Sequence, residues 1–262
     1  MKRSSLLLGL LAISLAAVAS SNAMAEDALS AILAHKLIRI AVPTDYPPYG
    51  SVDTDMVPRG YDIDMATLIA KKLNVKLELI PVTGPNRVAY LQTKKSDLTI
   101  SSLGKTPERE KVIDYSIAYA PFFDAVFGKK EILAKNYGEL TGKVIAVTRG
   151  SMQDEELSRM APGAVIKRFE DNNGTVSAFL AGQAQMFATG TAVAAAIKAK
   201  DPALSMDLKV ILSNAPCYIG VLKDEPQLVA KLNEIIREAK SNGSIDEMSK
   251  KWLGAPAGAL PE

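Results

Sequence analysis

Cysteine and histidine are almost absent from this chain of 262 residues, which contains one of each. A single cysteine excludes a disulfide framework and a zinc site built from cysteine pairs, so we expect Cys217 to be a small buried apolar residue. Catalysis by a Ser–His or Cys–His pair would depend on His35 alone, which lies near the N-terminal end. The composition therefore predicts neither a metal site nor catalytic residues.

Phosphate-binding motifs and an excess of positive charge are missing as well. The chain has neither a Walker-type loop nor a glycine fingerprint for dinucleotides, so no cofactor is expected. Beyond residue 25 it has 29 basic and 29 acidic residues, without a basic run. A neutral balance of this kind argues against nucleic-acid binding.

Long apolar runs are confined to the N-terminal segment. Two basic residues come first, residues 6–18 are apolar, and an Ala-Met-Ala cleavage motif stands at 23–25. The apolar stretch is too short to span a bilayer comfortably. We therefore expect residues 1–25 to be a secretory signal peptide that is cleaved after Ala25, and the mature protein to be periplasmic.

The rest of the chain shows alternating strand and helix patterns, twice over. The first series has strands at 37–42, 75–80 and 97–102 with helices at 61–73 and 86–94; the second has strands at 143–148, 165–169, 185–188 and 208–212 with helices at 151–160, 173–181 and 191–199. A strand at 218–222 and helices at about 225–241 and 244–252 follow. This repetition predicts two α/β lobes, each with a mainly parallel sheet flanked by helices. Between such lobes we expect a ligand-binding cleft.

An arginine stands near the start of a short helix, after the strand at 97–102. Thr106 suits the N-cap position and Pro107 the first helical position. Arg109 then falls in the first turn, where its charge opposes the helix dipole. A bound anion such as a carboxylate would explain this placement. The alternative, a surface arginine paired with a neighbouring acidic residue, stays open at this point.

Several short motifs occur in a fixed order along the mature chain. They are Tyr46-Pro47-Pro48-Tyr49, Gly60-Tyr61-Asp62-Ile63-Asp64, Thr106-Pro107-Glu108-Arg109, Asp114-Tyr115-Ser116, Arg149-Gly150-Ser151 and Lys251-Trp252-Leu253-Gly254. With them the chain resembles the periplasmic solute-binding proteins of polar amino-acid ABC importers, bacterial solute-binding protein family 3. The resemblance covers essentially the whole mature chain.

The resemblance implies a bilobal periplasmic-binding-protein fold with a hinge of two crossovers, near 120–127 and 212–218. Lobe 1 would comprise residues 26–120 and 218–262, and lobe 2 residues 121–217. Proteins of this family close around a small ligand and deliver it to a membrane ABC permease. A monomer that binds an amino acid or a related small carboxylate, and that is not an enzyme, is therefore expected.

The resemblance also implies roles for individual residues. Arg109 would hold the ligand carboxylate, and Ser101, Ser102 and Gly104 would hold the carboxylate or the ammonium. The segment with Ser151 and Met152 would close over the carboxylate from lobe 2, and Tyr46 would pack on the ligand side chain. Many relatives have a large aromatic residue where this chain has Gly84, and nearby Asn86 offers an amide, so a more polar pocket is expected. Arg149 is either a second cation of the pocket or a solvated side chain.

The chain departs from the family at the aspartate that usually pairs with the ligand ammonium. Gln185 and Gly190 stand where the family segment has its two aspartates. A buried ammonium without a counter-charge is costly, so another group must replace the carboxylate or the ligand is not an ordinary amino acid. The candidates are Asp171, Asn172 and Asn173, with Thr189 and Thr191 as neutral partners.

Two other functions stay open beside import. Exported cyclohexadienyl dehydratases resemble this family, but their chemistry needs a general acid, and the second-lobe positions near Gly190 offer no carboxylate in the sequence. A sensory module that reports its ligand to a membrane receptor is the third possibility. Import is the favoured interpretation.

Overall fold

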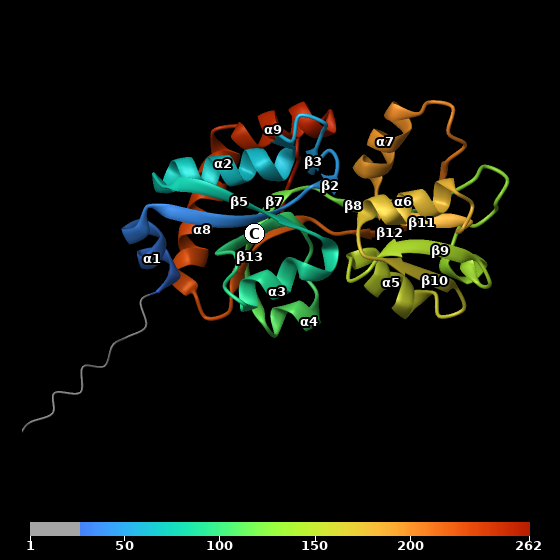
Figure 1. Ribbon diagram of the computed structural model, residues 1–262, viewed down its shortest axis with the longest axis horizontal. Helices are drawn as coiled ribbons and strands as arrows, with labels where there is room; N and C mark the ends of the chain where they lie inside the picture. Colours follow the sequence, from blue (N-terminus) through green and yellow to red (C-terminus); the bar gives the residue numbers. More distant parts are fainter. Residues whose placement is uncertain (1–26) are drawn as a thin grey trace, which may run out of the picture.

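The computed structural model describes residues 27–262, so the expected signal peptide lies outside the described residues. Two α/β bodies lie side by side (Figure 1), each built on one five-stranded sheet. Lobe 1, defined by its sheet, contains α1 (Ala28–His35), β1 (Leu37–Pro43), β2 (Asp45–Tyr46), β3 (Gly50–Val52), β4 (Pro58–Arg59), α2 (Tyr61–Leu73), β5 (Lys76–Val82), η1 (Gly84–Asn86), α3 (Arg87–Gln92), β6 (Leu98–Leu103), α4 (Pro107–Glu110), β7 (Ile113–Ala120), β13 (Cys217–Leu222), α8 (Pro226–Ser241) and α9 (Ser244–Leu253). Lobe 2 contains β8 (Phe123–Gly128), η2 (Tyr137–Leu140), β9 (Val144–Thr148), α5 (Met152–Met160), β10 (Val165–Phe169), α6 (Asn172–Leu180), β11 (Met186–Gly190), α7 (Thr191–Lys200) and β12 (Asp207–Asn214).

The two sheets have the same topology. Their strand orders are β5-β1-β6-β13-β7 and β10-β9-β11-β8-β12. In each sheet one strand runs against the others, β13 in lobe 1 and β8 in lobe 2. Each of these is the strand that the chain enters directly after passing between the lobes. The expected α/β fold with mainly parallel sheets is confirmed.

Helix α2 shows how the sequence pattern produces an element. It spans Tyr61–Leu73, the range that the apolar periodicity predicts, and it buries Ile63, Ala66 and Ile69 against the sheet. The preceding Gly60 has a φ of 143°, and a Cβ there would lie 2.1 Å from the carbonyl oxygen of Tyr49. Only glycine therefore fits at the start of this helix.

The chain crosses between the lobes twice, through residues 121–122 and 215–216. The amide N–H of Ala215 donates to the carbonyl oxygen of Phe122 (2.9 Å), which joins the two connections. The Tyr49 hydroxyl also donates to the carbonyl oxygen of Pro121 (2.8 Å). The first connection is shorter than the expected segment 120–127, because strand β8 already begins at Phe123.

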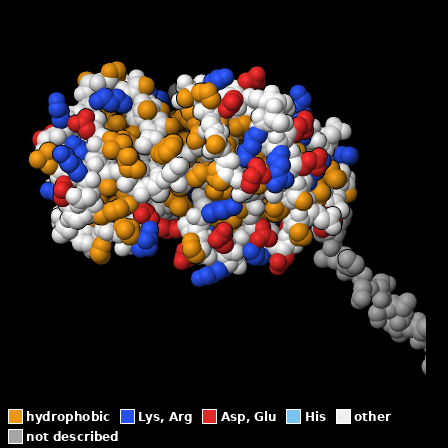
Figure 2. Space-filling view, turned by 180° about the vertical axis from the view of Figure 1, so that it is seen from behind, with side chains coloured by type: hydrophobic (Ala, Val, Ile, Leu, Met, Phe, Trp, Pro, Cys, Tyr) orange, Lys and Arg blue, Asp and Glu red, His pale blue; other side chains and the backbone are white. Residues whose placement is uncertain are grey.

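Several elements were not anticipated from the sequence. The turn-rich segment between residues 43 and 60 contains the three-stranded sheet β2-β3-β4, and β7, β8 and α1 were also missed. Cys217 is fully buried, as expected. On the face seen in Figure 2, Lys and Arg side chains are interspersed with Asp and Glu rather than gathered in one patch. Among the described residues, no helix combines the length and the apolar character needed to cross a bilayer.

Candidate functional site

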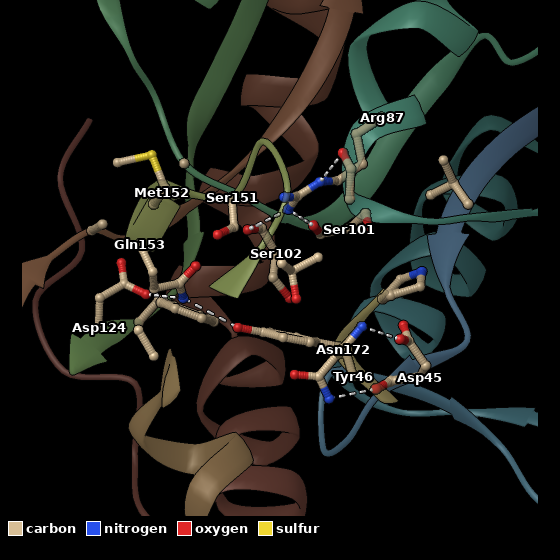
Figure 3. A pocket seen from close by; sticks show the side chains of 18 residues that line it. Asp45, Tyr46, Arg87, Ser101, Ser102, Asp124, Ser151, Met152, Gln153 and Asn172 are labelled. Atoms are coloured by element: carbon tan, nitrogen blue, oxygen red, sulfur yellow. Dashed lines mark hydrogen bonds between the residues drawn. The ribbon is translucent and has the colours of Figure 1, made fainter. Parts of the chain in front are cut away.

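A cavity lies between the lobes and takes its walls from both of them (Figure 3). Its empty space, the open mouth included, is about 600 Å³. The polar lining residues are Asp45, Tyr46, Arg87, Ser101, Ser102, Asp124, Thr148, Ser151, Gln153 and Asn172, beside apolar residues such as Phe122 and Met152. Seven of the nine residues expected at the ligand lie in this lining, namely Tyr46, Ser101, Ser102, Gly104, Ser151, Met152 and Asn172. Asn86 and Arg109 do not.

Strand β6 brings Ser101 and Ser102 to the cavity at its carboxyl end. Ser102 has a φ of 45°, a strained conformation for a residue with a Cβ. Asp62 holds it there from behind, since its Oδ2 accepts from the Ser102 N–H (2.8 Å) and from Oγ (3.0 Å). Burial raises the pKa of Asp62 to about 6, although Tyr119 and Ser102 donate to it. Asp62 therefore supports the serine wall, the part of the lobe 1 lining that Ser101 and Ser102 form.

Arg87, which was not anticipated, is the cation of the cavity. Its Nη1 donates to the carbonyl oxygen of Ser101 (3.0 Å) and its Nε to that of Gly84 (3.2 Å). Burial, followed by the nearby positive charge of Arg109, lowers the pKa of Arg87 below its ordinary value. Within residues 27–262, no carboxylate forms an ion pair with Arg87. The guanidinium is thus oriented by carbonyl groups and left without a counter-ion.

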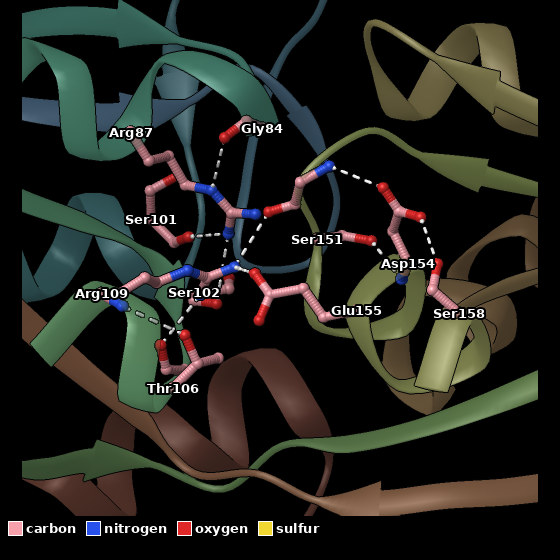
Figure 4. A network of polar contacts seen from close by, with 12 residues as sticks. Gly84, Arg87, Ser101, Ser102, Thr106, Arg109, Ser151, Asp154, Glu155 and Ser158 are labelled. Atoms are coloured by element: carbon pink, nitrogen blue, oxygen red, sulfur yellow. Dashed lines mark hydrogen bonds and ion pairs between the residues drawn. The ribbon is translucent and has the colours of Figure 1, made fainter. Parts of the chain in front are cut away.

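Arg109 binds an anion, but the anion belongs to the protein (Figure 4). Thr106 caps helix α4 as predicted, with its Oγ1 accepting from the Arg109 N–H (3.3 Å). The Arg109 guanidinium donates to the carbonyl oxygens of Gly104 and Gly150 (2.9 Å each) and to Glu155 Oε1 (2.8 Å). Since Gly150 and Glu155 belong to lobe 2, the arginine joins the two lobes. The expected ligand arginine is therefore occupied here, and the surface alternative is also wrong because the residue is buried.

Two other expected polar groups point away from the cavity. Asn86 is exposed, and its Nδ2 donates to Thr83 Oγ1 (3.1 Å), because its 3-10 turn directs the side chain outward. Arg149 is half exposed and pairs with Glu170 (2.8 Å). The space that Gly84 leaves open is used by lobe 2, since a Cβ there would lie 2.9 Å from Thr148 Cγ2.

Helix α5 of lobe 2 begins at the cavity. Ser151 is its N-cap and accepts from the Asp154 N–H (3.2 Å), while Asp154 Oδ2 accepts from the Gly150 N–H (3.0 Å). Met152, the next residue, reaches Gly104 of lobe 1: a Cβ on Gly104 would lie 2.9 Å from the Met152 Sδ. Ser151 is thus both a helix cap and a lining residue.

Helix α6 also begins at the cavity, but its free N–H groups are already bonded. Asp45 Oδ2 of lobe 1 accepts from the N–H groups of Asn172 (2.6 Å) and Asn173 (3.2 Å). The Asn172 side chain donates to the Asp45 carbonyl (2.9 Å). Asp171, the first candidate for the missing counter-charge, instead caps the helix by accepting from the Gly174 N–H (2.7 Å) and does not line the cavity.

The position of the missing family aspartate is closed by an aromatic ring. A Cβ on Gly190 would lie 2.5 Å from Phe122 Cζ, so a side chain cannot enter unless the ring moves. Directly opposite Gly190 in the antiparallel β11–β8 pair stands Asp124, which lines the cavity. The expectation that this part of lobe 2 offers no carboxylate was wrong. Burial raises the pKa of Asp124 to about 7.

Tyr46 extends from lobe 1 into the polar groups of lobe 2. Its hydroxyl oxygen accepts from the Gly190 N–H (3.2 Å), Thr189 Oγ1 (3.2 Å) and Gln153 Nε2 (3.3 Å). Its ring is stacked on Phe122 with centroids 6.2 Å apart. Burial raises the pKa of Tyr46 to about 12, so the hydroxyl keeps its proton at neutral pH. The lobes are therefore hydrogen-bonded to each other across the cavity.

Known proteins with this arrangement are bacterial solute-binding proteins. The sequence profile described as "Bacterial extracellular solute-binding proteins, family 3" matches residues 38–255. The chain belongs to this family. It is 27% identical over 239 residues to the glutamine-binding protein of an ABC transporter from Bacillus subtilis, covering 89% of this chain and 87% of that protein.

Solved structures of the family support the same assignment. A mutant of ArgBP from T. maritima is 30% identical, with a TM-score of 0.81, and the match covers 87% of this chain and 99% of that one. An ancestral amino acid-binding protein, a precursor of cyclohexadienyl dehydratase, is 28% identical with a TM-score of 0.77, covering 86% and 99%. The relatives are binding proteins by name, and the dehydratase alternative is not favoured.

Within residues 27–262, no three His, Cys, Asp or Glu side chains are grouped so as to hold a metal ion. The charged side chains of the cavity lining are Asp45, Arg87 and Asp124, beside neutral donors and acceptors.

Arg87 and Asp124 could have been found in the sequence. Arg87 opens a helix, so the argument from the helix dipole that selected Arg109 applies to it equally. Asp124 lies inside the apolar run Phe122-Phe123-Asp124-Ala125-Val126-Phe127, where a charge is expected to be buried.

Proposed function

We propose that the protein is the periplasmic solute-binding component of an ABC importer, and that it holds an amino acid or a related small carboxylate in the inter-lobe cavity. The observation that carries this proposal is the position of Arg87. It is a cation in the cavity wall that carbonyl groups orient and that no carboxylate of the described chain neutralises. A carboxylate of the ligand would supply that missing charge.

The surroundings of Arg87 favour a carboxylate of small size. Ser101 and Ser102 place their hydroxyl groups at the same wall, and α5 begins on the facing wall with Ser151. Hydroxyl groups and a helix N-terminus stabilise negative charge. Arg109 contributes from outside the lining through its positive charge, and by joining Gly104 to the second lobe.

Delivery to a permease follows from the same proposal. Relatives of this chain are named as components of ABC transporters. We expect residues 1–25 to direct export and to be removed after Ala25, and the mature protein to act as a monomer. We also expect two bodies to move about the two connections, one made of residues 26–120 with 218–262 and the other of residues 121–217.

The test is a ligand screen by thermal unfolding of the purified mature protein. The panel contains L-amino acids, the same molecules without the amine, dicarboxylates and amines. A ligand present at about 100 times its dissociation constant adds about 2.7 kcal/mol to the free energy of unfolding. Stabilisation by at least one carboxylate-bearing compound is expected, and a panel without any effect would reject the proposal. Product analysis of a cyclohexadienyl carboxylate incubated with the protein separates binding from turnover.

A further inference from the structure

Asp124 is a buried carboxylate without a cationic partner. Its side chain is fully buried, and it accepts hydrogen bonds from the Gln153 amide and from Ser213 Oγ (3.2 Å). Both donors are neutral, and no Lys, Arg or His among residues 27–262 forms an ion pair with it. An ionised carboxylate that is buried in this way costs several kcal/mol unless a positive charge compensates it.

The other carboxylates near the cavity are satisfied by the protein itself. Asp45 accepts two backbone N–H groups at the start of α6, and Asp62 accepts three hydrogen bonds behind the serine wall. Glu155 is paired with Arg109. Asp124 is therefore the acidic lining residue whose charge the protein leaves uncompensated.

The cavity thus contains two unpaired charges of opposite sign, one from each lobe. Arg87 lies on the wall of lobe 1 and Asp124 on the wall of lobe 2 (Figure 3). Gln153 bonds to both Asp124 and Tyr46, and so holds the carboxylate toward the cavity. A zwitterion satisfies both charges at once, whereas a simple carboxylate leaves Asp124 unpaired and an amine leaves Arg87 unpaired.

We infer that Asp124 binds the ammonium group of the ligand, so that the cavity takes zwitterionic amino acids in preference to the same molecules without the amine. This inference rests on the proposed function and adds the ligand class to it. It assigns the role of counter-charge to a residue of strand β8, and Gly190 needs no side chain because Phe122 fills its space. The ligand joins the lobes through one ion pair on each side.

The experiment compares matched ligands on matched variants. The probes are L-glutamine with 4-carbamoylbutanoate, L-arginine with 5-guanidinopentanoate, and L-cysteine with 3-mercaptopropionate, measured by titration calorimetry. The variants are Asp124→Asn and, as a control, Asp171→Asn, which removes the same charge from the same lobe outside the cavity and retains a capping side chain. Asparagine has the size of aspartate; its Oδ1 can still accept from Gln153 and its Nδ2 can donate to the Ser213 hydroxyl oxygen, so the variant is expected to fold.

The wild type should bind an amino acid at least about 100-fold more tightly than its amine-free partner. Asp124→Asn should lose about 100-fold for the amino acid and little for the partner, while Asp171→Asn stays within about threefold of wild type. Should Asp124→Asn not fold, Asp124→Glu keeps the charge and should keep the preference for the amine. Equal losses for both probes, or an unchanged amino-acid affinity, would overturn the inference. If the wild type binds only amine-free carboxylates, the inference about Asp124 is overturned but the proposed import function is kept. If the wild type binds none of the compounds in the ligand screen, the proposed function itself is rejected.

Discussion

The two lobes build their cavity walls differently, although their sheets share one topology. In lobe 1 the wall is held from behind: Asp62 fixes Ser102, and carbonyl groups orient Arg87. In lobe 2 the wall consists of the starts of α5 and α6 and of Asp124, and several of its groups are bonded to lobe 1 rather than to lobe 2. The wall of lobe 1 is thus held by contacts within lobe 1, whereas part of the wall of lobe 2 is held by contacts with lobe 1.

The difference has a consequence for ligand binding. On the proposed function, lobe 1 alone would receive the carboxylate, because Arg87 and the serines are positioned there. The ammonium would be reached when lobe 2 approaches and brings Asp124 to it. Affinity should therefore depend most on the lobe 1 cation, and closure most on the groups that cross between the lobes.

The largest effect is expected from removing the cation of lobe 1. Arg87→Met should weaken binding of any carboxylate ligand by about 4 kcal/mol, roughly 1000-fold, since it removes one partner of a buried charge pair. Arg109→Met should cost less, because this arginine lies outside the cavity lining and its guanidinium is already paired with Glu155. Titration calorimetry on both variants shows which arginine contributes more to the binding of the carboxylate.

Glu155→Gln is the control for that pair of variants. It leaves both arginines in place and breaks the same ion pair between the lobes, so it should weaken binding less than Arg109→Met, which also removes a positive charge near the cavity. If Arg109→Met instead loses more affinity than Arg87→Met, the ligand displaces Glu155 and Arg109 holds the carboxylate, as the family resemblance implies.

A smaller effect is expected from removing the support behind the serine wall. Asp62→Ala should lower the free energy of unfolding by about 3 kcal/mol, because Tyr119 and the N–H of Ser102 lose a buried acceptor. Ser102 would also leave its φ of 45°. Urea unfolding measures the loss, and Asp64→Ala, at the partly exposed neighbour that bonds to Lys251 and Trp252, is the comparison. Equal losses would show that Asp62 has no special structural role.

The pH dependence of stability should come from both walls. Burial raises the pKa of Asp124 to about 7 and that of Asp62 to about 6, from an ordinary value of 3.8. Between these values the folded protein binds more protons than the unfolded chain, so its stability falls as the pH rises. The free energy of unfolding of the ligand-free protein should therefore decrease from about pH 5 to about pH 7, by up to about 1.4 kcal/mol per pH unit for each group.

Asp124→Asn should remove the Asp124 share of this slope, and a bound amino acid should abolish the same share by favouring the ionised carboxylate of Asp124. The groups around Asp124 that shape this titration are Gln153, Ser213, Arg87 and Glu156. Urea unfolding at a series of pH values checks both statements. A wild-type profile that is flat, or one that Asp124→Asn leaves unchanged, would contradict the buried state of this carboxyl group.

Local patterns in the sequence predicted the helices after α1 and the presence of two α/β bodies. Helix α2 has the predicted bounds because its apolar face and its flanking Gly60 and Asn74 are all local signals. The strands β7 and β8 were missed because they belong to two different sheets although only residues 121 and 122 separate them. A family resemblance predicts the approximate positions of the two crossovers. The exact bounds of the strands depend on their pairing with segments that are distant in the sequence.

The polar site was predicted less well, for a physical reason. Arg109 and Arg87 carry the same local signal, and what distinguishes them is Glu155, which lies 46 residues from Arg109 in the chain and meets it through lobe contact. The replacement for the family aspartate was sought at the start of α6 and next to Gly190 in sequence, whereas Asp124 is the neighbour of Gly190 across the sheet. Which charge pairs with which is decided by tertiary contacts that no local pattern contains.

The smallest effects should come from the glycines of lobe 1 against which lobe 2 closes. On Gly104 a Cβ would lie 2.9 Å from the Met152 Cγ and Sδ, and a methionine side chain can move aside. On Gly84 it would lie 3.1 Å from the carbonyl oxygen of Arg149 and 2.9 Å from Thr148 Cγ2, where backbone and a branched side chain cannot yield as easily. Gly104→Ala should thus weaken binding by less than about 1 kcal/mol and Gly84→Ala by more, both through closure. Ligand affinities and the radius of gyration from solution scattering, measured on both variants, test this. A larger loss of affinity in Gly104→Ala than in Gly84→Ala would mean that the contact with α5, and not the contact with the end of β9, limits how closely the lobes approach.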